Sequence, residues 1–172
     1  NVSWPTKAWK TSSPEQQGMD SSALADLVRF GALEKMDSLL VTRHGMIVTE
    51  AYYAPFRTGH KHRINSVTKA VTSTLIAIAL KNGLLDSLDH RVLDFFTDRE
   101  IANLDERKQA MTIQHLLDMT SGLQWAEGLS DAAPVSLRAM RRSPDWQQFI
   151  LDQPMAQPPG TAFDYNSGNS HL

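Results

Sequence analysis

A serine and a lysine three positions apart, Ser66 and Lys69, form the most reactive pairing in the sequence. On a helix, residues with this spacing lie on one face with Cβ atoms roughly 5–6 Å apart, so the lysine amine can reach the serine oxygen. A serine hydroxyl is a weak nucleophile that needs a base, and a lysine amine acts as a base only when it is neutral. The pair predicts nucleophilic catalysis, although a capping serine beside a solvated lysine has the same spacing.

The segment that follows this pair favours the neutral amine. Residues 70–80 are apolar on nearly every helical face, as in a helix buried at the centre of a domain. Burial disfavours the ammonium form, and so does the positive end of the helix dipole. A lysine at position 69 therefore breaks a local rule of helix stability, which is typical of a functional position.

Tyr165 is the second candidate for chemistry, in the run Tyr165-Asn166-Ser167. A tyrosine held near a lysine loses its proton more easily, because the cation favours the phenolate. Such a tyrosine can carry a proton between a nucleophile and a leaving group. A tyrosine after a Pro-Pro-Gly turn can equally be an aromatic plug over the core.

Three further features are weaker candidates. Trp125 could line a substrate cleft, although core or rim packing is the default for a tryptophan. His60 and His62 could suggest a metal pair, but no third ligand has a helpful spacing and Lys61 between them opposes a cation. His115 falls on an apolar helix face and is expected to be structural. We therefore expect neither a metal site nor a cofactor.

Composition excludes several classes of function. The chain has 172 residues, 41% hydrophobic and 21% charged, with a net charge of −2. Both signs of charge are interspersed, so the sequence predicts no nucleic-acid footprint and no membrane-surface patch. The longest apolar run is too short to span a bilayer. Without cysteines the redox compartment is undecided, and either a cytoplasmic or a periplasmic or secreted location is open.

The elements that must position these residues follow from periodicity. A helix capped by Ser21 or Ser22 is predicted first, then two strands around residues 39–41 and 46–48 joined by a turn at Gly45. A second helix begins near Ser66 and ends at Asn82-Gly83. Shorter helices are predicted over residues 112–119 and 146–151, with residues 1–18 irregular. Two strands alone are marginal, so further strands or helices are needed to cover them.

Three blocks in order resemble one family of hydrolases. Arg63–Lys69 (R-I-N-S-V-T-K) resembles its Ser-x-x-Lys block, and Met111–Leu123 resembles its T-I-x-H-L-L…T-S-G-L segment. Pro159–Gly168 is similar to its P-G-T-x-F-x-Y segment. The family is the serine β-lactamase and penicillin-binding-protein-like group, which includes class C β-lactamases, family VIII esterases and 6-aminohexanoate-dimer hydrolases. The hairpin at residues 43–45 also matches the group's first two strands.

The resemblance implies a role for each matching residue. Ser66 would be the nucleophile, Lys69 its deprotonating partner and Tyr165 the proton relay. Ser167 would bind substrate in the place usually held by an asparagine, a departure that argues against a dedicated class C β-lactamase and favours amide or ester substrates. The family's Lys-Thr-Gly-like triplet is absent; in the family it lies on a strand beyond the point that matches Leu172, and this strand supplies half of the oxyanion hole.

We therefore expect an α/β fold, with an antiparallel sheet flanked by helices and the C-terminal strands missing from this chain. Residues 1–83 would form the first part of the α/β domain, 84–157 a mainly helical region and 158–172 the start of the tyrosine segment. The expected function is a serine hydrolase that cleaves small amides or esters. A penicillin-binding or sensor module acylated without efficient turnover is the alternative, and a scaffold without activity is a third. The isolated chain should be inactive, with the C-terminal remainder as its partner, possibly as a separate polypeptide.

Overall fold

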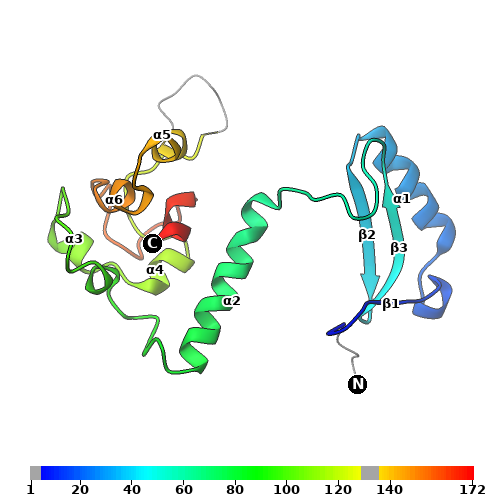
Figure 1. Cartoon of the computed structure of the whole chain (residues 1–172), viewed down its shortest axis with the longest axis horizontal. Helices are drawn as coiled ribbons and strands as arrows, with labels where there is room; N and C mark the ends of the chain where they lie inside the picture. The colour runs from blue at the N-terminus through cyan, green and yellow to red at the C-terminus, as the bar shows by residue number, and fades with distance from the viewer. Residues whose placement is uncertain (1–4, 129–135) are drawn as a thin grey trace. The chain divides into compact units, whose positions relative to one another are not determined.

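The fold is α/β, and a computed structural model describes residues 5–128 and 136–172 of it (Figure 1). Its contacts divide the chain into two units, one that ends at Arg63 and one that runs from Ile64 to Leu172. This division falls directly before the Ser66 segment. It differs from the expected organisation into residues 1–83, 84–157 and 158–172.

The first unit contains the predicted hairpin. Strands β2 (Ser38–Arg43) and β3 (Met46–Tyr52) pair antiparallel, with Arg43 opposite Met46. The two residues between them, His44 and Gly45, both have positive φ, 50° and 77°. Two successive residues with positive φ match the right-handed twist of the paired strands, which explains the tight connection.

A third strand lies in the segment that was expected to be irregular. Strand β1 (Lys10–Thr11) pairs in parallel with β3, so the sheet order is β1-β3-β2. The prediction was wrong here because the strand is two residues long and both are exposed, which leaves no hydrophobic alternation to read. The sheet is therefore mixed, not purely antiparallel.

Helix α1 (Ser21–Leu33) is the predicted first helix, but Asp20 caps it in place of Ser21 or Ser22. The Asp20 carboxylate accepts a hydrogen bond of 2.7 Å from the Ser22 amide. Gly31 brings the helix close to Tyr53, because a Cβ at this position would lie 2.2 Å from the tyrosine hydroxyl oxygen. That hydroxyl donates to the Val28 carbonyl oxygen at 2.9 Å.

The second unit is mainly helical. The predicted helices near residues 66, 112 and 146 are confirmed, whereas α3 and α5 were not predicted. Its elements in order are η2 (Asn65–Val67), α2 (Thr68–Lys81), η3 (Val92–Phe95), α3 (Glu106–Gln109), α4 (Ile113–Leu117), α5 (Ser136–Arg142), α6 (Trp146–Leu151) and η4 (Ser167–His171). No helix among the described residues is both long and apolar enough to cross a membrane.

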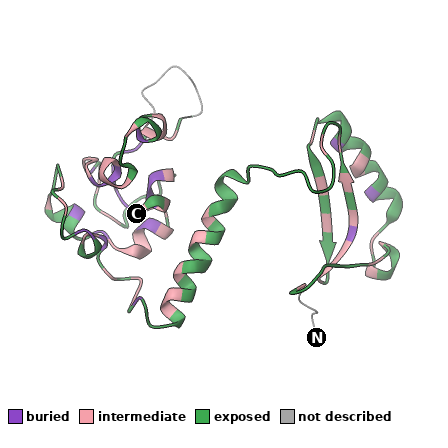
Figure 2. Cartoon of the chain, viewed as in Figure 1, coloured by how far each residue is buried: buried purple, intermediate pink, exposed green. Residues whose placement is uncertain are grey.

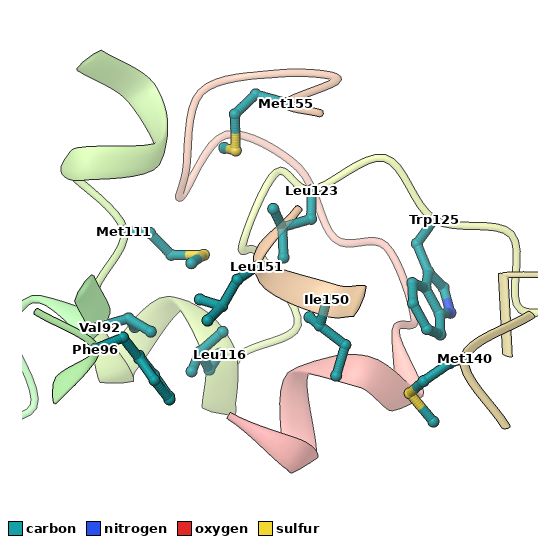
Figure 3. Packing of buried hydrophobic residues seen from close by; sticks show 10 residues of the cluster. All are labelled: Val92, Phe96, Met111, Leu116, Leu123, Trp125, Met140, Ile150, Leu151 and Met155. Atoms are coloured by element: carbon teal, nitrogen blue, oxygen red, sulfur yellow. The ribbon is translucent and has the colours of Figure 1, made fainter. Parts of the chain in front are cut away.

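One apolar core holds the second unit together (Figure 3). Its ten buried side chains are Val92, Phe96, Met111, Leu116, Leu123, Trp125, Met140, Ile150, Leu151 and Met155. Beside them lies Lys108, which is fully buried and donates to the carbonyl oxygens of Ala102 at 2.8 Å and Leu151 at 2.7 Å. Burial lowers the pKa of Lys108, against the smaller opposing effects of Asp152 and Asp105.

Helix α2 differs from the buried helix that the sequence predicts. None of its residues is buried, and Figure 2 shows it mostly as exposed. Val71, Leu75 and Ile78 are 51%, 58% and 47% exposed and fall at helical spacing on one face. Thr72, Ser73 and Ile76 instead line a cavity with α4 and η4. The described residues of this unit thus cover one side of α2, and the helix is apolar on more sides than they cover.

Candidate active site

Ser66 lies in the 3-10 turn η2, which leads directly into α2. Asn65, the residue before it, has φ of 44°, in the left-handed region that asparagine tolerates better than most residues. The turn leaves the Ser66 side chain exposed on the cavity side of the helix start. A strained residue directly before an accessible hydroxyl is typical of a functional site.

Lys69 stands one turn further along and contacts two hydroxyl groups. Its Nζ donates to Ser66 Oγ at 3.2 Å and to Ser167 Oγ at the same distance. The predicted pairing of Ser66 and Lys69 is therefore within reach. The partner of Lys69 at Ser167 is 98 residues away in the sequence, so the fold itself assembles this contact.

Tyr165 reaches the same serine oxygen from the other direction. Its hydroxyl donates to Ser66 Oγ at 2.7 Å, and Lys69 Nζ lies 4.9 Å from the centre of its ring. The hydrogen bond with Ser66 lowers the pKa of Tyr165, and the hydrogen bond and positive charge of Lys69 lower it further. The structure thus brings Tyr165 together with the serine and the lysine. This position is not the one expected of an aromatic plug over the core.

Backbone contacts fix the segment that carries Tyr165. Gly160, with φ of 79°, donates its amide to the Thr120 carbonyl oxygen at 2.8 Å, and Asp164 donates to the Met119 carbonyl oxygen at 2.8 Å. Asn166 is 1% exposed and caps η4 through a hydrogen bond of 3.2 Å from the Asn169 amide. These contacts place Ser167 at the start of η4.

Glu127 is a further site residue that the sequence analysis missed. Its carboxylate accepts hydrogen bonds from Ser167 Oγ at 2.5 Å, from the Ser167 amide at 2.9 Å and from Trp125 Nε1 at 2.6 Å. Burial raises the pKa of Glu127, but the donors from Ser167 and Trp125 and the charge of Lys69 together lower it below its usual value. No spacing signal marks Glu127; only its position two residues after Trp125 could have drawn attention to it.

Trp125 packs in the core, which was the default for a tryptophan, and is not among the residues that line the cavity. The side chain is 8% exposed and belongs to the hydrophobic core, with its ring close to Gly168. Only its indole N–H points toward the site, through the hydrogen bond to Glu127. A large aromatic ring is stabilised most by full burial, with a partner for its N–H, and Trp125 satisfies both.

A cavity of about 600 Å³ opens over these groups. Ser66, Lys69, Glu127 and Ser167 line it, and α5 and α6 contribute Leu137, Met140, Arg141 and Trp146. His171 also lines it; burial lowers the pKa of His171, and the charges of Lys69 and Arg141 lower it further. The cavity thus combines hydroxyl groups, an amine and a carboxylate with a partly apolar wall.

The three histidines considered in the sequence analysis, His60, His62 and His115, are not among the residues that line this cavity. His115 Nδ1 accepts from the Thr112 amide at 3.1 Å and completes the cap of α4, so its role is structural as expected. His60 and His62 have ring centres 6.1 Å apart, around Phe56. Within the described ranges, no three His, Cys, Asp or Glu side chains gather as metal ligands would.

Solved structures share this fold. A protein described as a 6-aminohexanoate-dimer hydrolase from Bacillus anthracis is 18% identical, with a TM-score of 0.65 over 86% of this chain and 40% of its own. A protein described as a β-lactamase from Bacteroides dorei DSM 17855 is 20% identical, with a TM-score of 0.63 over 87% and 43%. EstCE1, a hydrolase with promiscuous acyltransferase activity, is 20% identical, with a TM-score of 0.67 over 87% and 45%.

The chain therefore spans less than half the length of these structures, and at such identities the likeness concerns the fold alone. A comparison with curated proteins found no match. The model of one protein family, that of the β-lactamases, matches residues 10–172 and so covers nearly the whole chain, including every residue of the cluster around Ser66. The chain belongs to the β-lactamase family.

Proposed function

We propose that the chain carries the nucleophile of a serine hydrolase that cleaves amide or ester bonds through an acyl-enzyme. The observation that carries the proposal is the pair of contacts at one atom: Ser66 Oγ accepts from Lys69 Nζ at 3.2 Å and from Tyr165 Oη at 2.7 Å. Two titratable groups on one hydroxyl oxygen supply both a base and a proton relay.

In the proposed reaction, the neutral Lys69 amine or the Tyr165 phenolate takes the Ser66 proton while Ser66 Oγ bonds to the substrate carbonyl carbon. The carbonyl π bond opens onto its oxygen, and the Ser66 amide is one donor for this oxyanion. The intermediate then collapses: the bond to the leaving group breaks, and that group takes a proton from Tyr165. This proton is the one that Tyr165 took from Ser66 or, where Lys69 was the base, a proton of the phenol that Lys69 then replaces. Water repeats the sequence on the ester of Ser66 and releases the acid. This chemistry requires no cofactor.

The substrate class we propose is a small amide or ester. The cavity of about 600 Å³ falls within the range of small-molecule sites. Ser167, in the position where class C β-lactamases usually have asparagine, already gives its hydroxyl hydrogen to Glu127 and accepts from Lys69. These bonds leave it less free to donate to a β-lactam amide carbonyl than an asparagine amide would be.

We also propose that residues beyond these 172 complete the site. The chain matches 40–45% of the length of its structural neighbours, and α2 exposes an apolar face within the described residues. A further segment, continuous with this chain or separate from it, would cover that face and supply the second oxyanion donor. This segment is the partner that we expect the activity to need.

Hydrolysis of a p-nitrophenyl ester by the intact protein tests the proposal. Ser66→Ala should abolish turnover, because Ser66 Oγ is the atom that forms the acyl-enzyme in the proposed reaction. A penicillin that labels the protein while the ester is not turned over would favour the acylated sensor instead. Neither turnover nor labelling would indicate a scaffold and overturn the proposal. Ser73→Ala, on the same helix with its hydroxyl bonded to the Lys69 carbonyl oxygen, is the matched control and should keep activity.

A further inference from the structure

Glu127 occupies an unusual place behind the proposed catalytic groups. Its carboxylate does not touch Ser66. It is linked to Lys69 through a single residue, because Ser167 Oγ is hydrogen-bonded to both. Oε2 accepts from the Ser167 amide and from Trp125 Nε1, and Oε1 accepts from Ser167 Oγ. With three protein donors on its two oxygens, Glu127 is committed to the protein and is poorly placed to bind a cationic substrate.

The direction of each hydrogen bond follows from the chemistry of the groups. An ionised carboxylate only accepts, so the single hydrogen of the Ser167 hydroxyl lies toward Glu127. The lone pairs of Ser167 Oγ are then left for Lys69, whose amine donates at 3.2 Å. The same amine lies 3.2 Å from Ser66 Oγ, so its contact with Ser167 fixes the direction from which it approaches the serine.

We infer that Glu127 is a positioning residue of this site: through Ser167, it holds Lys69 in the orientation in which the amine meets Ser66. This inference rests on the proposed function. Trp125 anchors the arrangement, because its ring is buried in the core while its N–H holds the carboxylate. The route from the core to the amine is therefore Trp125, Glu127, Ser167 and Lys69, in which every step is a hydrogen bond of 3.2 Å or less.

Glu127 also places a negative charge beside basic side chains. Lys69 from α2, Arg141 from α5 and His171 from η4 line the same cavity, and Tyr165 lies next to Lys69. The charge of Glu127 raises the pKa of Tyr165, against the larger lowering by Ser66 and Lys69. Removal of this charge therefore favours the Tyr165 phenolate. In the proposed reaction the acid limb of the pH–rate profile follows the ionisation of Tyr165, so this limb moves to lower pH.

The test compares Glu127→Gln with Glu100→Gln in the intact protein, with a p-nitrophenyl ester as the substrate. Glu100 undergoes the same chemical change, but it is exposed, and it accepts a hydrogen bond from Gln148 Nε2 through its backbone carbonyl oxygen. Glu127→Gln should lower kcat by about 10- to 100-fold, the range for hydrogen bonds to a charged group, with KM changed less than kcat. Its acid limb should move to lower pH, and Glu127→Asp should return the limb toward the original position. Glu100→Gln should leave the rate and the profile unchanged.

Several results would overturn the inference. One is a kcat and a pH profile of Glu127→Gln that match those of the unmodified protein. Another is an effect of this substitution on KM alone, which would indicate a contact with the substrate. If Glu127→Gln does not melt cooperatively, Ser167→Ala decides: it should reproduce the loss in kcat, and an unchanged kcat contradicts the inference. Ser66→Ala separates the two levels, because activity that survives it refutes the proposed function, whereas its loss beside a normal Glu127→Gln refutes only the role of Glu127.

Discussion

The proposed site has a packed wall and a helix wall, which are held in different ways. The packed wall, formed by Trp125, Glu127, Asn166 and Ser167, lies against the hydrophobic core, and both Trp125 and Asn166 are buried. The helix wall, formed by Asn65–Lys69, contains no buried residue. The packed wall is therefore positioned by close packing, whereas within the described residues the helix wall is positioned mainly by polar contacts.

Two hydrogen bonds join these walls or their neighbours across nearly 100 residues of sequence. Tyr165 donates to Ser66, and Lys69 donates to Ser167. In each bond one partner is a proposed catalytic group on the helix wall. The contacts proposed to serve the chemistry thus also hold the proposed nucleophile in place. Their geometry matters because small displacements of reacting groups lower a rate by large factors.

The largest expected effect comes from removing these links together. Lys69→Ala and Tyr165→Phe should each lower kcat by about 1,000- to 10,000-fold, as members of a catalytic unit do. The double variant should cost little more than the worse single change, because both residues handle the same proton. Losses that multiply would show that the two residues act independently.

The second prediction concerns the chain without any further segment. Residues 1–172 expressed without any further segment should lose at least about 100- to 1,000-fold in kcat, the cost of one missing oxyanion donor, and should melt without a cooperative transition. Circular dichroism and ester hydrolysis with and without the downstream segment measure both effects. A sharp melt with full activity from residues 1–172 would contradict the proposal that another segment completes the site.

The packed wall depends on the core beneath it, and Lys108→Met probes that core. The substitution leaves the carbonyl oxygens of Ala102 and Leu151 without their buried donor, which should lower the free energy of unfolding by about 2–4 kcal/mol. Chemical denaturation measures this loss. Leu104→Met, at a half-exposed position, is a control that should change stability little.

The same lysine predicts a pH dependence. Because burial lowers the pKa of Lys108 in the folded state, the unfolded chain binds more protons between the folded and unfolded pKa values. Its contribution to stability therefore increases as the pH rises through that alkaline interval. Lys108→Met lacks this contribution, so the slope of its unfolding free energy against pH should be lower. Identical slopes would contradict the lowered pKa.

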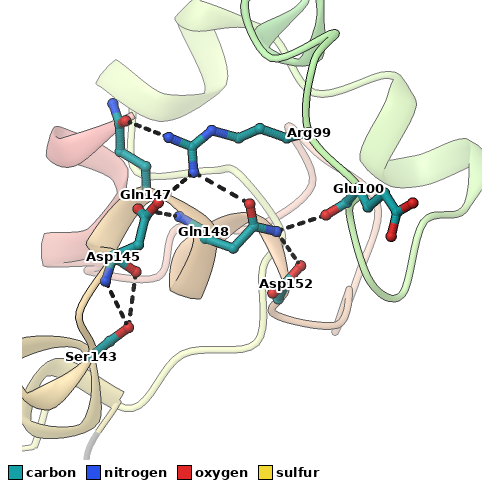
Figure 4. A network of polar contacts seen from close by, with 7 residues as sticks. All are labelled: Arg99, Glu100, Ser143, Asp145, Gln147, Gln148 and Asp152. Atoms are coloured by element: carbon teal, nitrogen blue, oxygen red, sulfur yellow. Dashed lines mark hydrogen bonds and ion pairs between the residues drawn. The ribbon is translucent and has the colours of Figure 1, made fainter.

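The smallest effect is expected at the rim of the packed region (Figure 4). Arg99 donates to Asp145 at 2.8 Å and to Gln147 and Gln148 at 3.3 Å each. Since the Asp145 side chain is 49% exposed, solvent screens the ion pair, and Arg99→Met should cost about 1 kcal/mol or less. A loss above that, insensitive to added salt, would show that the rim supports the site as strongly as the core does.

Much of this site could be predicted from the sequence because its signals are local. The spacing of Ser66 and Lys69 places them on one helix turn, and α6 and the His44-Gly45 hairpin follow from periodicity and turn residues. Tyr165 was a candidate from its own chemistry, but only the resemblance linked it and Ser167 to Ser66, because no spacing rule does so. Glu127 could not be found this way, because its role depends on a contact with Ser167, 40 residues further along the chain. The exposure of α2 also lay beyond the sequence, since an apolar helix indicates that it needs cover without showing what covers it.

Covalent labelling of the intact protein tests the central claim most directly. A fluorophosphonate probe should form its adduct on Ser66, because only this hydroxyl accepts hydrogen bonds from both Lys69 and Tyr165 among the described residues. Peptide mapping by mass spectrometry locates the adduct, and Lys69→Ala should slow its formation. An adduct on Ser66 is the predicted result. An adduct on another serine, with Ser66 unmodified, would contradict the account.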